Sequence, residues 1–167
     1  MSSLQSPDLV IFDCDGVLID SQIIQCQVDA AELTRVGYPI TADELAQRFI
    51  GTATKEIQVH VEAVLGRTLP TDFETRRDRL VDEAYRRELK PIAGVENAMV
   101  AMGLPACVAS NARMVRLRDV LNLTGLLALF DPHIFGADLV PRPKPAPDLF
   151  LFAAEQMGAL PTRSLVI

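Results

Sequence analysis

The chain has 167 residues, of which 49% are apolar, 23% charged and 5% aromatic, and its formal net charge is −6. The apolar share excludes an intrinsically disordered chain, and the short apolar runs exclude a spanning helix, which needs about 20 such residues. The acidic balance argues against a nucleic-acid partner, because an acidic protein repels phosphate backbones at long range.

The N-terminal half begins with a predicted strand and continues with predicted helices. The strand covers residues 8–12 and is followed by the polar turn Asp13-Cys14-Asp15-Gly16. Helices are then expected over residues 20–35, 41–51, 54–65 and 71–90. Each of them begins at a capping residue or stops at a Gly or Pro. With short connections and no strand between them, these helices predict a compact bundle.

After Pro91, predicted strands alternate with predicted helices, which is typical of parallel βαβ units. Strands are expected over residues 106–109, 134–135 and 164–167, and helices over residues 95–102, 114–121 and 147–158. The predicted fold class is therefore α/β. We expect a doubly wound, Rossmann-like core of residues 1–17 and 91–167, with a helical bundle inserted over residues 18–90.

The N-terminus and the cysteines indicate a reducing compartment. Residues 1–6 lack the basic start and apolar stretch of a secretory signal. The cysteines at 14, 26 and 107 are odd in number and widely spaced, which predicts neither a disulfide framework nor a CxxC metal pair. We therefore expect a cytoplasmic protein with no membrane partner, present as a monomer or weak homodimer.

Asp13 and Asp15 are the strongest candidates for site residues, because they lie two apart directly after a buried strand. In a doubly wound sheet, ligands bind beyond the carboxyl ends of the strands. Two carboxylates this close favour a neutralising cation, and oxygen ligands of this kind suit Mg²⁺. The alternative interpretation is an ordinary Asp-x-Asp-Gly turn with solvated side chains.

Three segments occur in a recognisable order along the chain. They are residues 10–21 (VIFDCDGVLIDS), residues 108–111 (VASN) and residues 142–150 (RPKPAPDLF). These segments resemble the first three signature motifs of the haloacid dehalogenase (HAD) superfamily, in its phosphatase and phosphomutase branch. The resemblance covers essentially the whole chain, the helical insert included. Within the superfamily it is strongest to the group that holds phosphoglycolate phosphatase, 6-phosphogluconate phosphatase and β-phosphoglucomutase.

The resemblance implies a site for phosphoryl transfer. Asp13 would be the nucleophile that forms an aspartyl-phosphate, and Asp15 the acid/base that protonates the leaving group and then activates water. Ser110 and Asn111 would bind the phosphoryl group, helped by backbone amides at the start of the following helix. Lys144 would bind phosphate and neutralise its charge and that of the nucleophile. The implied cofactor is Mg²⁺, held by the Asp13 carboxylate and the backbone carbonyl of Asp15.

The helical insert resembles the family's cap, which closes over the substrate and excludes water. Arg48, Thr52 and Lys55 flank a loop at residues 49–51 and are candidates for contacts with hydroxyl or carboxylate groups of the substrate. The alternative is that the two cations are exposed helix-end residues. The arginine-rich run at residues 76–79 favours a solvated helix face over an anion site.

The predicted function is a Mg²⁺-dependent phosphatase acting on a small phosphorylated metabolite, a sugar phosphate or sugar-acid phosphate. Asp15 argues against dehalogenation, because relatives that displace halide lack this acid/base. Gln25 stands where sugar phosphomutases of this branch usually carry His, which favours hydrolysis. A phosphomutase is the alternative of the same class, and a non-catalytic binding or regulatory module is the alternative of a different class.

Residues 163–167 resemble the start of the strand before the family's fourth motif, whose acidic residues complete the Mg²⁺ site. The family's last strand and final helices have no counterpart in this sequence, so we expect these residues to belong to a longer protein. A truncated product, natural or proteolysed, is the alternative. We expect a polypeptide of only these 167 residues to be nearly inactive, because Mg²⁺ would keep too few protein ligands.

Overall fold

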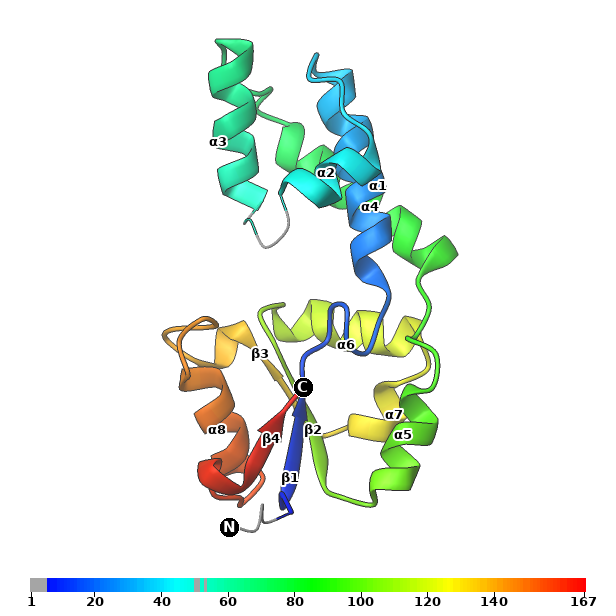
Figure 1. Cartoon of the computed structure of the whole chain (residues 1–167), viewed down its shortest axis with the longest axis vertical. Coiled ribbons are helices and arrows are strands. Elements are labelled where there is room, and N and C mark those ends of the chain that lie inside the picture. The colour runs from blue at the N-terminus through cyan, green and yellow to red at the C-terminus, as the bar shows by residue number, and fades with distance from the viewer. Residues whose placement is uncertain (1–5, 50–51, 53) are drawn as a thin grey trace. The chain divides into compact units, whose positions relative to one another are not determined.

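The computed structural model describes residues 6–49, 52 and 54–167 and consists of two compact units (Figure 1). The first, the α/β unit, comprises Met1–Asp20 and Leu89–Ile167, and the second, the helical unit, comprises Ser21–Glu88. The identification of the helical unit as a substrate cap stays a prediction. In the described part of the chain, no helix has both the length and the apolar character needed to cross a membrane.

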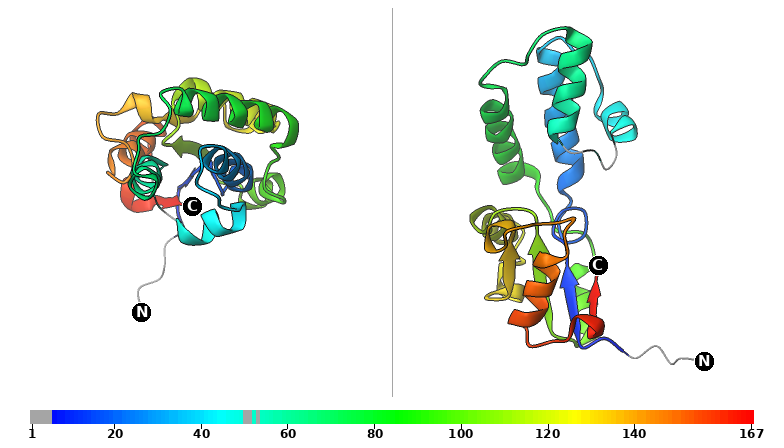
Figure 2. Two further views of the ribbon diagram at one scale, coloured as in Figure 1. Left: turned by 90° about the horizontal axis from the view of Figure 1, so that it is seen from above. Right: turned by 90° about the vertical axis from the view of Figure 1, so that its left-hand side faces the viewer.

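Four strands of the described residues form one parallel sheet in the order β3-β2-β1-β4. They are β1 (Leu9–Phe12), β2 (Ala106–Ser110), β3 (Ile134–Gly136) and β4 (Ser164–Val166). All four residues of β1 are buried, as expected for a strand covered on both faces. Because the strands are parallel, their carboxyl ends meet at one edge of the sheet, as the arrows in the right-hand view of Figure 2 show.

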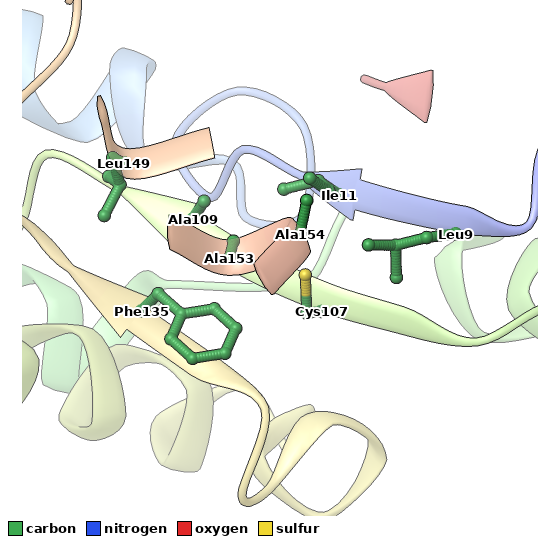
Figure 3. Close-up of a cluster of buried hydrophobic side chains, with 8 residues drawn as sticks. All are labelled: Leu9, Ile11, Cys107, Ala109, Phe135, Leu149, Ala153 and Ala154. Carbon is green, nitrogen blue, oxygen red and sulfur yellow. The ribbon is translucent and has the colours of Figure 1, made fainter. Parts of the chain in front are cut away.

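Helices cover both faces of this sheet, which confirms the predicted α/β class. The helices and 3-10 turns of the unit are α5 (Val95–Met102), α6 (Met114–Leu123), α7 (Leu127–Phe130), η1 (Ala137–Leu139), α8 (Asp148–Gln156) and η2 (Pro161–Arg163). Successive side chains of a strand point to opposite faces. Leu9 and Ile11 therefore pack on the face covered by α8 (Figure 3), whereas the ring of Phe12 lies 5.9 Å from that of Phe130 in α7.

The helical unit contains the four helices that the sequence predicts. They are α1 (Ser21–Arg35), α2 (Ala42–Arg48), α3 (Thr54–Leu65) and α4 (Phe73–Glu88). A capping box starts α2: the Thr41 side chain accepts from the backbone N–H of Glu44, and the Glu44 side chain accepts from the backbone N–H of Thr41. Apolar residues from all four helices, among them Leu33, Leu45, Val61 and Phe73, make a shared core.

Ion pairs join α1 to α4 inside the helical unit. The Glu32 carboxylate is buried and accepts hydrogen bonds from Nε of both Arg35 and Arg76, each at 2.9 Å. Arg77 forms a two-point pair with Asp29 at 2.6 and 3.1 Å, and its side chain is only 15% exposed. The expectation of a solvated face at residues 76–79 is therefore wrong for Arg77, which ties two helices together.

Gly136, at the end of β3, allows the loop after β2 to approach closely. A Cβ atom at this position would lie 2.7 Å from Met114 N and 2.8 Å from Ala112 O. The same loop is held by a hydrogen bond from Ala137 N to Ala112 O at 3.0 Å. The Asp138 carboxylate accepts from Met114 N at 2.8 Å and so caps α6. Residues 110–114 are thereby fixed against the end of β3.

We predict that Gly136→Ala lowers the free energy of unfolding by about 1–3 kcal/mol, because backbone atoms must move to admit the methyl group. Denaturant unfolding followed by circular dichroism measures this effect. Asn97→Ala, on an exposed part of α5, is the control and should change stability by less than about 0.5 kcal/mol. A Gly136→Ala protein as stable as its parent would contradict the close approach.

Candidate active site

Asp13 is placed by the pairing of β1 with β4. Its backbone N–H donates to Ile167 O at 2.8 Å, which continues the ladder between the two strands by one residue. One carboxylate oxygen, Oδ1, accepts from Cys14 N at 2.7 Å and lies 2.7 Å from Nζ of Lys144. The side chain is 38% exposed. Asp13 therefore presents an oriented, accessible carboxylate at the carboxyl edge of the sheet.

Asp15 lies in a tight turn that directly follows β1. Cys14 O accepts backbone hydrogen bonds from Leu18 at 2.9 Å and Ile19 at 3.1 Å. Gly16 N donates to Ile19 O at 2.9 Å, and its φ of 75° is one that glycine adopts readily. This turn holds the exposed Asp15 at the same edge of the sheet as Asp13, which precedes it by two residues.

Lys144 comes to Asp13 from a loop that follows β3 and η1. Besides the ion pair with Asp13, its Nζ donates to Ala109 O of β2 at 3.2 Å and lies 5.5 Å from the centre of the Phe150 ring. The Lys144 side chain is only 15% exposed. The structure thus brings together the residues that the sequence predicts as nucleophile and as charge-neutralising lysine.

Ser110 ends β2 beside this pair and is almost fully buried. Its Oγ accepts a hydrogen bond from Ala112 N at 3.1 Å. Because that bond uses a lone pair and not the proton, the Ser110 hydroxyl keeps a donor for a phosphoryl oxygen. At the start of α6, the Met114 N–H donates to Asp138 Oδ1 at 2.8 Å. The predicted help from backbone amides of this segment stays a prediction.

The Asn111 carboxamide is directed at the backbone of Lys144. Its Nδ2 donates to Lys144 O, and its Oδ1 accepts from Lys144 N, both at 2.9 Å. A phosphate contact from Asn111, as the sequence predicts, would therefore use its backbone N–H. Sequence analysis missed this pairing. The sequence offered one indication of it, which is that an Asn side chain carries a donor and an acceptor in one plane and can pair with a peptide group.

Cys14, between the two acids, is buried and is not an activated thiol. Burial raises the pKa of Cys14 well above its ordinary value, and the nearby carboxylates of Asp15 and Asp13 raise it further. The thiolate is the nucleophilic form of cysteine. Cys14 is therefore not a candidate nucleophile of this site.

The three residues predicted as substrate contacts in the helical unit lie in different surroundings. Thr52 lines a cavity of about 230 Å³ in the helical unit, together with Gln25, whose Nε2 donates to Tyr85 Oη at 2.6 Å. The guanidinium of Arg48 lies against the Phe49 ring, 5.5 Å from its centre. Lys55 is exposed in the first turn of α3. Their roles with substrate stay predictions, and residues 50 and 51 of the flanking loop lie outside the described residues.

The metal-binding capacity of the site rests on oxygen atoms. Among residues 6–49, 52 and 54–167, no group of three or more His, Cys, Asp or Glu side chains is placed to hold a metal ion. The candidate donors are the Asp13 carboxylate and the backbone carbonyl of Asp15. Hard oxygen donors of this kind fit Mg²⁺, which commonly takes one or two carboxylates and completes its octahedron with water and phosphate.

The aspartate–lysine pair lies at the carboxyl edge of a parallel α/β sheet, which is where such sheets bind their ligands. The family model of the haloacid dehalogenase-like hydrolases matches residues 7–167. The chain belongs to this family.

Relatives and solved structures agree with this assignment. The 6-phosphogluconate phosphatase of Escherichia coli K12 is 30% identical over 152 residues, which span 90% of this chain and 69% of that protein. A haloacid dehalogenase-like protein of unknown function from Agrobacterium tumefaciens superposes with a TM-score of 0.90 at 42% identity, covering 96% of this chain and 73% of that one. A HAD family hydrolase from Deinococcus radiodurans was solved with bound phosphate and sodium. It superposes with a TM-score of 0.79 at 33% identity, covering 97% of this chain and 72% of that one.

We predict that Cys14 resists alkylation in the folded protein at pH 8, because it is buried and carries a raised pKa. Cys107, whose pKa is raised to about 12 by burial, should be equally protected, whereas the more exposed Cys26 provides the comparison. Iodoacetamide labelling followed by peptide mass spectrometry measures the three rates. Cys14 should react at least about tenfold more slowly than Cys26. Faster labelling of Cys14 than of Cys26 would show that the thiol is activated after all.

Proposed function

We propose that the protein is a Mg²⁺-dependent phosphatase that hydrolyses a small phosphorylated carbohydrate, a sugar phosphate or sugar-acid phosphate. The observation that carries this proposal is the 2.7 Å pairing of Lys144 Nζ with Asp13 Oδ1 at the carboxyl edge of the sheet. Two relatives support it: one is a 6-phosphogluconate phosphatase, and the Deinococcus hydrolase was solved with phosphate bound.

In the first step, a carboxylate oxygen of Asp13 attacks phosphorus and the bond from phosphorus to the ester oxygen breaks. Asp15 donates its proton to the departing alkoxide, so that an alcohol leaves and an aspartyl-phosphate remains. In the second step, Asp15 takes a proton from a water molecule that attacks phosphorus. The acyl-phosphate bond then breaks, which regenerates the Asp13 carboxylate and releases inorganic phosphate.

Fixed positive charge and hydrogen-bond donors lower the barrier to both steps. Lys144, held beside Asp13, offsets the negative charge that gathers when a phosphoryl group approaches a carboxylate. The buried Ser110 hydroxyl donates to a phosphoryl oxygen. When bound by Asp13 and the carbonyl of Asp15, Mg²⁺ supplies further charge neutralisation of the phosphoryl oxygens.

Gln25 supports hydrolysis over the phosphomutase alternative. A phosphomutase must protonate and deprotonate sugar hydroxyl groups, a task suited to a titratable side chain such as His. A carboxamide does not titrate, and that of Gln25 donates a hydrogen bond to Tyr85. The joint placement of Asp13, Ser110 and Lys144 likewise supports a catalyst over a non-catalytic binding module.

We predict that Asp13→Asn lowers phosphate release by at least about 10³-fold, because an amide is a poor nucleophile and cannot form the acyl-phosphate. The measurement is inorganic phosphate released from a panel of sugar phosphates and sugar-acid phosphates, and it is made on the longer protein to which these residues are expected to belong. Asp119→Asn, at an exposed position of α6, is the matched control and should retain the parent rate. Parent-like turnover by a folded Asp13→Asn variant would rule out the assignment of the nucleophile.

We also predict that removal of divalent ions abolishes turnover. Dialysis against EDTA should lower phosphate release by at least about 100-fold, and Mg²⁺ added back in excess should restore it, because Mg²⁺ offsets phosphoryl charge. The same panel assay measures both states, with circular dichroism as the check on folding. Full turnover after exhaustive chelation would contradict a magnesium-dependent reaction.

A further inference from the structure

Asn111 makes a two-point contact with the backbone of a residue 33 positions later. Both polar groups of its carboxamide are used on Lys144, at 2.9 Å each, one donating to the carbonyl and one accepting from the N–H. This is the pattern by which neighbouring peptide groups pair in a sheet. The side chain of Asn111 thus acts as an extra peptide group that fastens the Lys144 loop to the end of β2.

The Lys144 side chain is anchored on the same short segment. Its Nζ donates to Ala109 O at 3.2 Å, and it meets Asp13 Oδ1 at 2.7 Å. Lys144 is therefore held at both ends by residues 109–111, its backbone through Asn111 and its ammonium through Ala109. The nearby two-point ion pair of Arg142 with Asp148, at 2.9 Å for each bond, joins the loop to α8 and not to β2.

We propose that Asn111 is a positioning residue, which fixes the backbone of Lys144 so that its ammonium already lies beside Asp13 before substrate binds. This inference rests on the proposed phosphatase function, in which Lys144 neutralises phosphoryl charge. A preorganised charge needs no rearrangement at the moment of reaction, whereas a displacement of about 1 Å at such a site can cost about 10²-fold in rate.

Only asparagine satisfies both backbone groups of Lys144 from this position. Aspartate of the same length has no donor for Lys144 O, and its charge would face that carbonyl oxygen. Alanine offers neither group, and glutamine is one methylene longer. Asn111→Ala and Asn111→Asp should therefore both release the loop, while the buried sheet residues stay in place.

The first test is a double-mutant cycle on phosphate release. Asn111→Ala should lower kcat by about 10- to 100-fold with a smaller change in KM, because the lost placement acts on transition-state charge. In a Lys144→Met background, the same substitution should change kcat by less than about twofold, since Asn111 has no ammonium left to position. Asn122→Ala, at an exposed position of α6, should match the parent. Losses that multiply in the double variant would show that Asn111 acts independently of Lys144 and would overturn the proposal.

The second test needs no activity, so it remains decisive if Lys144→Met turnover is too low to measure. The chain contains three lysines, and brief acetylation with mass spectrometry reports the reaction rate of each amine. In Asn111→Ala, the shielded Lys144 amine should react about 5- to 10-fold faster than in the parent, because its loop opens more often. Lys55 and Lys90, which are already exposed, should react at parent rates. Continued protection of Cys107 from alkylation would show that the sheet remains folded.

The two tests separate failure of this inference from failure of the proposed function. Unchanged acetylation of Lys144 in both Asn111 variants would overturn the anchoring role even if the parent is an active phosphatase. Faster acetylation of Lys144 in a parent that releases no phosphate would support the anchoring role and reject the phosphatase reaction.

Discussion

The pairing of Lys144 with Asp13 is the interaction on which the candidate site depends. The Lys144 side chain is 15% exposed and that of Asp13 is 38% exposed, so the pair is shielded but still open to a ligand. It places a positive charge 2.7 Å from the carboxylate that we propose as the nucleophile toward a negatively charged phosphoryl group. The parallel sheet makes the pairing possible, because the segments that carry both residues leave the sheet at the same edge.

Close backbone contacts around the sheet edge keep these loops in place. Asp13 continues the ladder with β4, and Gly136 admits the loop after β2 against the end of β3. The loop that bears Lys144 is fastened to residues 109–111 by its backbone and by its ammonium. The site is therefore built from the ends of adjacent strands. Hydrogen bonds between loops far apart in sequence fix the positions of its side chains.

The strands, the α/β class and the meeting of the motif residues could be predicted from the sequence. Buried strands have short apolar runs, and in parallel sheets the residues that follow them converge. The partner of the Asn111 side chain could not be predicted, since it depends on the path of a loop 33 residues away. The same reason applies to Arg77. The charged run in its helix predicts a solvated face, but the structure pairs the Arg77 side chain with Asp29 of another helix. The predicted substrate contacts of the helical unit stay predictions, because they depend on loop conformation, which periodicity and capping rules do not specify.

The central claim is that Asp13 carries the phosphoryl group during turnover. The most direct measurement is an acid quench of the enzyme during steady-state turnover, followed by borohydride reduction and peptide mass spectrometry. Reduction converts an aspartyl-phosphate to homoserine, so the account predicts homoserine at position 13 and unmodified aspartate at position 15. Homoserine at position 15 instead, or none at position 13 in an enzyme quenched while it is releasing phosphate, would contradict the account.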